Sequence, residues 1–114
     1  MNFKETPEFQ RNFKRLKKKY LSLDEDLAEF KKVVSVFPLG RGKHFAVLTE
    51  KAGVKIVKAR LFCRYLKGDS LRTTYAYCEV EQWIEFIELY AKNEQETESS
   101  WLIDSYLKSL SKEV

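Results

Sequence analysis

The first forty residues carry hydrophobic side chains at intervals of three or four, the spacing that places them on one face of a helix. The first apolar stripe consists of Phe9, Phe13, Leu16 and Tyr20. Thr6 and Pro7 precede this stripe, as an N-cap residue and a proline suited to the first helical position. The pattern predicts an amphipathic helix that begins at Pro7.

A second helix is predicted to follow at once, because Ser22 and Glu25 have the S-x-x-E spacing of a capping box. Its apolar positions are Leu27, Phe30, Val33, Val34 and Phe37. Pro38 cannot continue a helix and ends this one. The two helices therefore form a hairpin whose apolar stripes face a common core.

From Lys43 the hydrophobic period changes to two, the repeat of a strand. Strands are predicted at residues 43–50, 54–66, 71–78 and 82–91, with a short one at residues 2–5. The segment 82–91 would also suit a helix, and residues 97–111 return to helical spacing. The predicted fold is α+β: an N-terminal helical hairpin packed on an antiparallel sheet of four to five strands, plus a C-terminal helix, in a single domain of residues 1–114.

The predicted strand 54–66 has the most informative alternation. Its core-facing positions are Val57, Ala59, Leu61, Cys63 and Tyr65. Lys58, Arg60 and Arg64 lie in line on the other face. Like charges in line repel one another and do not favour folding, so this row indicates a surface that binds a polyanion. An ordinary solvated face is the alternative interpretation.

The distribution of charge points the same way. The net charge is +4, yet lysine and arginine are concentrated in residues 1–20 and 41–67, while residues 21–40 and 68–114 are acidic. Such polarity is typical of nucleic-acid-binding proteins. The candidate RNA-binding cations are Lys14, Arg15, Lys17, Lys18, Lys55 and Arg64.

The two cysteines bear on the cellular compartment. Residues 1–10 lack the apolar stretch of a secretion signal, and no apolar run is long enough to cross a bilayer. We therefore expect a cytoplasmic protein without membrane contact, in which Cys63 and Cys78 are reduced and buried.

Further polar residues extend the candidate site. Arg72, on the neighbouring predicted strand, can reach the surface of Lys58 and Arg60, and arginine is suited to a forked grip on phosphate. Lys92 ends the last strand nearby. The phenols available for stacking on a base or for proton donation belong to Tyr75, Tyr77 and Tyr90.

Neither a metal nor a cofactor is expected. His44 is the only histidine and is interpreted as a surface residue, and there is no Gly-rich phosphate loop. A reaction on RNA would then be metal-free attack of a 2′-hydroxyl on the adjacent phosphorus. It needs a base, cations on the developing charge and an acid for the leaving oxygen.

Three motifs give the chain a family resemblance: K-A-R at 58–60, L-R-T-T-Y at 71–75 and I-E-L-Y-A-K-N-E at 87–94. With the order of a helical hairpin and then strands, the chain resembles the RelE/HigB branch of type II toxins, whose fold is shared with ParE-type gyrase poisons. The resemblance covers nearly the whole chain. It implies an mRNA endonuclease, often ribosome-dependent, that represses translation and is silenced by a cognate antitoxin.

The resemblance also implies a catalytic set, made up of Lys58, Arg60, Arg72, Tyr90 and Lys92. Arg60 matches the basic residue that ends the family's central-strand motif, and Arg72 matches the arginine that opens its R-x-x-Y strand. Both are interpreted as phosphate stabilisers and, as surface residues, are expected to contribute little to stability. Several relatives have a histidine at the end of the last strand, where this chain has none. The base is therefore open among Tyr90, Lys92 and Lys58, since a lysine among cations can act as a base.

Two other functions remain open. One is inhibition of DNA gyrase by a ParE-like protein, and the other is a non-catalytic module that binds RNA or the ribosome. The row of cations favours the nuclease, because a gyrase inhibitor does not need to organise a phosphate site.

Overall fold

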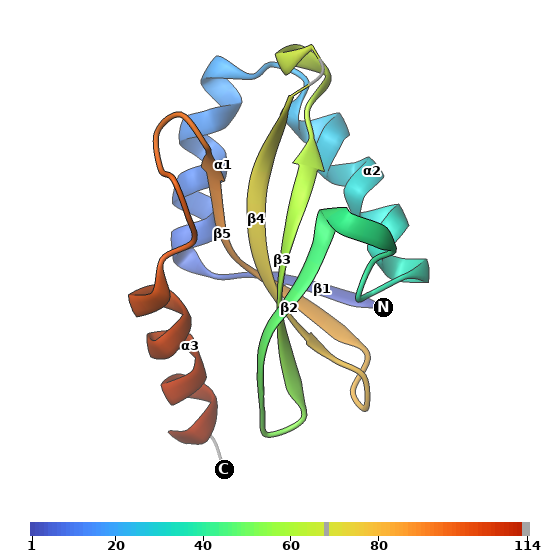
Figure 1. Ribbon diagram of the computed structural model, residues 1–114, viewed down its shortest axis with the longest axis vertical. Helices are drawn as coiled ribbons and strands as arrows, with labels where there is room; N and C mark the ends of the chain where they lie inside the picture. The colour runs from blue at the N-terminus through green and yellow to red at the C-terminus, as the bar shows by residue number, and fades with distance from the viewer. Residues whose placement is uncertain (68, 113–114) are drawn as a thin grey trace.

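The computed structural model describes residues 1–67 and 69–112, so Gly68, Glu113 and Val114 of the predicted domain lie outside the described residues. Figure 1 shows the arrangement of its helices and strands. Two short 3₁₀ helices are named η1 and η2. The bounds of all these elements are β1 Asn2–Glu5, α1 Pro7–Lys19, α2 Leu23–Val36, η1 Gly42–His44, β2 Phe45–Lys51, β3 Val54–Phe62, η2 Arg64–Leu66, β4 Ser70–Cys78, β5 Trp83–Ala91 and α3 Ser100–Lys112. The predicted α+β class is confirmed.

The strands form one sheet in the order β1-β5-β4-β3-β2. Strands β2 to β5 pair in antiparallel fashion, as their short connections dictate. The prediction of a purely antiparallel sheet is wrong at one edge, because β1 pairs in parallel with β5, with Asn2 beside Trp83. β1 meets β5 from far along the chain, so no hairpin turn sets its direction.

Two predicted strands are too long. β3 ends at Phe62, where the chain turns into η2, and not at Leu66. β2 begins at Phe45, so Lys43 and His44 lie in η1. The alternation of polar and apolar residues cannot locate the end of a strand when the turn residues continue the same pattern.

The two predicted helix caps have different outcomes. Thr6 caps α1 as predicted, its hydroxyl accepting the Phe9 N–H at 3.1 Å. The capping box of α2 is wrong, since the side chain of Ser22 makes no capping hydrogen bond. Its hydroxyl donates to Asp26 at 2.6 Å and accepts the N–H of Tyr65 in η2 at 3.1 Å. A tertiary contact has therefore replaced the local cap.

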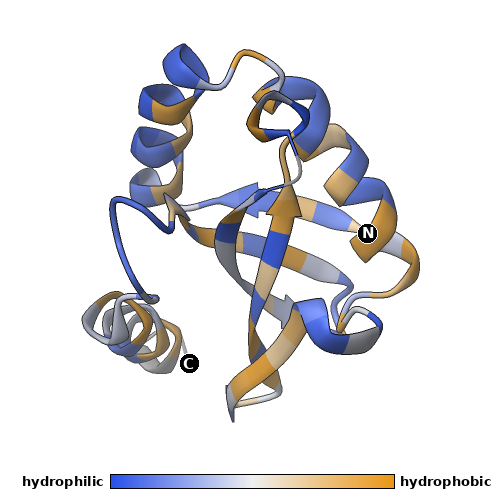
Figure 2. Ribbon diagram, turned by 45° about the horizontal axis from the view of Figure 1, so that its top comes forward, coloured by the Kyte–Doolittle hydropathy of each residue, from blue (hydrophilic) through white to orange (hydrophobic). Residues whose placement is uncertain are grey.

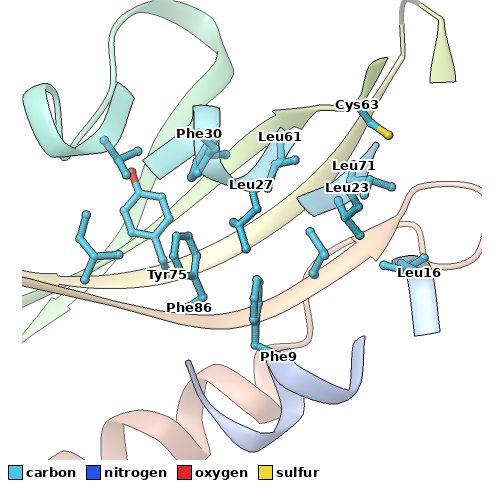
Figure 3. Close-up of a cluster of buried hydrophobic side chains, with 14 of the residues drawn as sticks. Phe9, Leu16, Leu23, Leu27, Phe30, Leu61, Cys63, Leu71, Tyr75 and Phe86 are labelled. Atoms are coloured by element: carbon cyan, nitrogen blue, oxygen red, sulfur yellow. The ribbon is translucent and has the colours of Figure 1, made fainter. Parts of the chain in front are cut away.

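Both faces of the sheet carry a hydrophobic core. The helical hairpin covers one face, and the core residues there include Phe9, Leu16, Leu27, Phe30, Leu61, Cys63, Tyr75 and Phe86 (Figure 3). On the other face, Ile103 and Tyr106 of α3 pack over Ile56 and Ile87. α3 begins near the N-terminal end of α1 and runs toward the end where a hairpin turn joins β2 to β3 (Figure 1).

The burial of some side chains agrees with the predicted core, and that of others does not. Both cysteines are buried and form no disulfide, as predicted. Phe13 is only partly buried, and Val33 and Phe37 of the second helical stripe are 48% and 39% exposed. Within residues 1–67 and 69–112, none of the helices has the length and apolar character required to span a membrane.

Candidate active site

The register of β3, β4 and β5 brings the predicted catalytic residues together. Arg60 pairs with Arg72, and Arg72 pairs with Tyr90, so these three residues form one row across the sheet. Lys58 lies two positions along β3 from Arg60, on the same face. The tertiary structure thus assembles one cationic surface from three strands.

This surface is the floor of an open cleft of about 320 Å³. The cleft occupies the part of the sheet face that α3 does not cover. Its lining side chains are Lys43, His44, Phe45, Ala46, Leu48, Lys58, Ala59, Arg60, Arg72 and Lys92. The charged side chains among them are all cations, so the cleft suits an anionic ligand.

The two arginines are held differently. Arg72 is only 9% exposed, and its Nη1 donates to the Ser70 hydroxyl at 2.6 Å and to the Ser70 carbonyl at 3.1 Å. Arg60 is exposed, and within the described part of the chain its side chain has no hydrogen bond or ion pair. The expectation of two surface arginines is therefore wrong for Arg72, which is a fixed donor, whereas Arg60 is free to adjust to a ligand.

Tyr90 is buried at the end of the arginine row, and its hydroxyl has no hydrogen-bond partner among the described residues. Burial, together with the negative charges of Glu98 and Glu88, raises the pKa of Tyr90 to about 12, although Arg72 acts in the opposite direction. The phenol therefore remains protonated at neutral pH. Tyr90 can donate a hydrogen bond but is unsuited to act as the base.

Lys58 is engaged by a residue that the sequence analysis missed. Its ammonium donates to Glu98 at 2.8 Å. Glu98 belongs to the hydrophilic segment between β5 and α3, visible in Figure 2. Burial raises the pKa of Glu98, but hydrogen bonds from Lys58 and Thr97 outweigh this effect and hold the pKa below its ordinary value. The only sequence signal was a run of alternating glutamates, which does not indicate that the segment returns to β3.

His44 also belongs to the cleft, contrary to its interpretation as a plain surface residue. Its ring meets Phe62 edge-on, with the ring centroids 5.3 Å apart and an interplanar angle of 85°. Its Nδ1 is buried without a hydrogen-bond partner in the described part of the chain. The sequence did offer one indication that His44 is part of the site, because it directly precedes β2, the strand that pairs with β3.

Two of the predicted phenols lie on the opposite face of the sheet. Alternation along β4 places Tyr75 and Tyr77 away from Arg72 and in the core under the helical hairpin. Tyr75 is fully buried, donates to the Pro38 carbonyl at 2.6 Å, and has a pKa raised far above its ordinary value by burial. The prediction that Tyr75 and Tyr77 can act on RNA is therefore wrong.

Two predicted RNA-binding cations of the β3 region also lie outside the cleft. Arg64 leaves the basic row because β3 ends before it, and it pairs with Glu25 at 2.7 Å and with Asp26 at 3.3 Å. Lys55 lines a separate hollow with Glu79. Alternation already places Lys55 on the face of β3 opposite Arg60, whereas the placement of Arg64 depends on where β3 ends.

The basic residues of α1 form a second surface. α1 packs on the sheet face opposite the cleft. Arg15 and Lys17 are already engaged, each in a 2.7 Å ion pair with an acidic neighbour. Lys14 and Lys18 are exposed and have no ion pair among the described residues. The structure therefore does not join the helix cations to the cleft.

The carboxylates near the site have structural roles. Glu85 accepts a hydrogen bond from the Tyr106 hydroxyl at 2.6 Å, and Glu88 accepts from the Ser99 N–H at 3.2 Å, so both attach α3 and its leading segment to the sheet. In the described ranges no group of three histidine, cysteine or acidic side chains is placed to hold a metal ion. What the cleft offers is a set of cationic donors, which can bind a phosphodiester and stabilise charge on its oxygens.

Comparison with known proteins identifies the fold. No protein-family profile matches the chain, and no curated protein sequence matches it. Among solved structures, the chain is similar to a chain of the archaeal RelE–RelB complex from Pyrococcus horikoshii OT3, with a TM-score of 0.60 and 20% identity. The likeness covers 80% of this chain and 93% of that one. The protein therefore has a RelE-like fold, the fold that its sequence motifs predicted.

Proposed function

We propose that the protein is the toxin of a type II toxin–antitoxin system and acts as a metal-independent mRNA endonuclease. The observation that carries the proposal is the direct pairing of Arg60 with Arg72 on adjacent strands, in a cleft that also holds Lys58 and Lys92. Like charges directly opposite one another destabilise a sheet, so their placement is best explained by an anionic ligand between them. The RelE-like fold supports the same function.

The cleft provides for the attack of a ribose 2′-oxygen on the adjacent phosphorus. Negative charge then develops on the non-bridging phosphate oxygens. Arg72 is held by Ser70 as a preorganised donor to one of these oxygens, and Arg60 is free to reach the other. Lys92 is exposed at the far side of the cleft and is the candidate acid for the leaving 5′-oxygen. Lys58 becomes available to phosphate when Glu98 releases it.

The proposed substrate is cytoplasmic mRNA held in the ribosome. Lys14 and Lys18, the cations of α1 that have no ion pair within residues 1–67 and 69–112, would contact ribosomal RNA without base preference. The proposed partner is a cognate antitoxin, whose segment would cover the cleft by folding on it as a helix or an added strand. That the similar archaeal chain comes from a complex of RelE with RelB supports this partner.

Induced expression tests the proposal. The wild-type protein should arrest growth and generate new mRNA 5′ ends. Arg60→Ala should lose both effects, because removal of one donor to the developing oxyanion typically costs on the order of 100-fold to 1000-fold in rate. Arg11→Ala is the matched control, since it removes an exposed arginine that pairs with Glu8 on α1, and it should remain toxic.

Each other outcome identifies a different function. Full toxicity of Arg60→Ala would show that the cleft is not the site. Growth arrest without new mRNA ends would support the alternative of a gyrase inhibitor. Ribosome binding by a wild-type protein that neither arrests growth nor cleaves mRNA would support the non-catalytic module.

A further inference from the structure

The row of cleft side chains continues beyond β3 to the start of β2. Phe45 pairs with Ala59 in the antiparallel register, so the preceding position, His44, lies beside Arg60. Arg60, Arg72 and Tyr90 form the row across β3, β4 and β5, and His44, the last residue of η1, extends it at the start of β2. Lys92, which follows β5, lines the cleft at the opposite end from His44.

This arrangement matches the geometry of displacement at phosphorus. The attacking and leaving oxygens lie roughly in line on opposite sides of the phosphorus, so the base and the acid must also stand on opposite sides. Adjacent strands are about 4.8 Å apart, which leaves room for a phosphate over the two arginines between His44 and Lys92.

The other ionisable groups in the cleft or beside it are unsuited to remove a proton. Tyr90 remains protonated, and Lys58 is occupied by Glu98. Arginine is charged at every relevant pH, and lysine is ordinarily a cation at neutral pH. Imidazole is the side chain whose ordinary pKa lies near neutrality, which makes it the common general base.

The ring of His44 is also oriented. Phe62 supports it edge-on at 5.3 Å. Nδ1 is buried without a partner among the described residues and the residue lines the cleft, so we assign the contact with a ligand to Nε2. The ring thus presents one nitrogen to a ligand bound beside Arg60.

From this geometry we propose that His44 is the general base of the cleft, an inference that rests on the proposed ribonuclease function. Nε2 of His44 takes the proton of the 2′-hydroxyl as the bond between the 2′-oxygen and phosphorus forms. The bond from phosphorus to the 5′-oxygen breaks, and this oxygen takes a proton from the ammonium of Lys92. The products are a 2′,3′-cyclic phosphate and a 5′-hydroxyl, and proton exchange with water restores both side chains.

The test is the pH dependence of cleavage, measured with the full-length protein on a free oligoribonucleotide and on mRNA in a translation reaction. The charged groups that face His44 are Lys43, Lys58, Arg60, Arg72 and Lys92. None of these cations ordinarily loses its proton on the acidic side of neutrality. In the wild type, kcat/KM should therefore fall about tenfold per pH unit on the acidic side, as one base becomes protonated.

Two variants at His44 should remove this fall of kcat/KM at acidic pH, which is called the acidic limb. His44→Ala and His44→Gln should each lower kcat by about 100-fold to 10,000-fold, the usual contribution of a general base. Free imidazole should restore part of the activity of His44→Ala, an effect that a merely structural role would not produce. Lys43→Gln is the matched control, because it removes a neighbouring cation and should raise KM while the acidic limb remains.

The possible failures are distinguishable. Activity of His44→Ala within about twofold of the wild type would overturn the assignment and leave the ribonuclease function intact. An acidic limb that persists in the residual activity of either variant would do the same. A wild-type protein that cleaves neither substrate would overturn the proposed function itself, and with it the role of His44.

Discussion

Side chains that share one face of β3 lie in two different surroundings. Ile56 is fully buried beneath α3, whereas Arg60, four positions further along the strand, is exposed in the cleft. The register between β3 and β4 is unbroken through both regions. The difference therefore does not arise in the strand but in the placement of α3, which covers one part of the face and leaves the other part open.

Lys58 marks the boundary between the covered and the open part. It lies between Ile56 and Arg60 on the same face and pairs with Glu98, from the segment that leads to α3. Apolar burial holds the covered part together, whereas charge dominates the open part. Substitutions on the two sides of Lys58 should therefore change different quantities, stability on one side and ligand chemistry on the other.

The largest expected effect on stability is that of Ile56→Ala, on the covered side. Truncation of a fully buried isoleucine should lower the free energy of unfolding by about 2–5 kcal/mol, because it removes buried contacts and leaves a cavity. Denaturant unfolding measures the change. Val47→Ala, at a position that is 49% exposed on β2, is the control and should change stability by less than about 0.5 kcal/mol. Equal effects of the two variants would show that burial of Ile56 beneath α3 does not stabilise the fold.

Alanine substitution at the two arginines should have an effect of intermediate size on the free energy of unfolding, and the effect should differ between them. Arg72→Ala removes charged hydrogen bonds to Ser70 from a buried position and should cost about 1.5–3 kcal/mol of stability. Arg60→Ala should cost less than about 0.5 kcal/mol, since its side chain is exposed and unpaired in the described part of the chain. Thermal and denaturant unfolding of both variants measure the difference, and a stable Arg72→Ala would show that the hydrogen bonds to Ser70 contribute little to stability.

The smallest expected effect is that of Glu98→Gln at the boundary. The pKa of Glu98 is lowered in the folded protein, so its ion pair contributes stability that is fully present above the ordinary value of 4.5 and is lost as the pH falls through the folded-state value. At neutral pH the substitution should cost at most about 1 kcal/mol, because the pair is partly exposed.

The pH dependence separates Glu98 from its neighbours. The stabilities of the wild type and Glu98→Gln should approach each other as the pH falls below the ordinary value of 4.5, and converge once the pH is below the lowered pKa of Glu98. Glu96→Gln, at an exposed position of the same segment, should match the wild type throughout. Glu98→Gln should also bind RNA with a steeper salt dependence, by about 0.7 in the logarithmic slope for one added phosphate contact. A stability difference that is independent of pH would argue against the ion pair.

Much of the fold could be predicted from the chain because periodicity is a local property. Alternation with period two along 54–62 correctly separated the face of Leu61 from the face of Arg60. The same reasoning failed at Arg64, because the end of β3 depends on a turn that contacts Ser22 and Asp26, about forty residues earlier. Such contacts leave no periodic signal near the turn.

Only the part of the candidate site that depends on local rules could be predicted from the sequence. Lys58, Arg60 and Arg72 follow from alternation and from the pairing of consecutive strands, both of which are local rules. The burial of Tyr90, which makes it unsuited as a base, and the approach of Glu98 to Lys58 depend on where the segment after β5 returns. His44 is outside any strand, and its place in the cleft follows from the sheet edge that β2 forms.

The sequence by itself determined which elements form and which side chains share a face, since these depend on backbone geometry within a few residues. The tertiary structure decided which part of each face is covered, which charges are paired and which protons can be exchanged. The physical reason is that burial and ion pairing depend on the distance between groups far apart in the chain. Ile56 and Arg60 share one face of one strand, and only the position of α3 makes one of them core and the other part of a cleft.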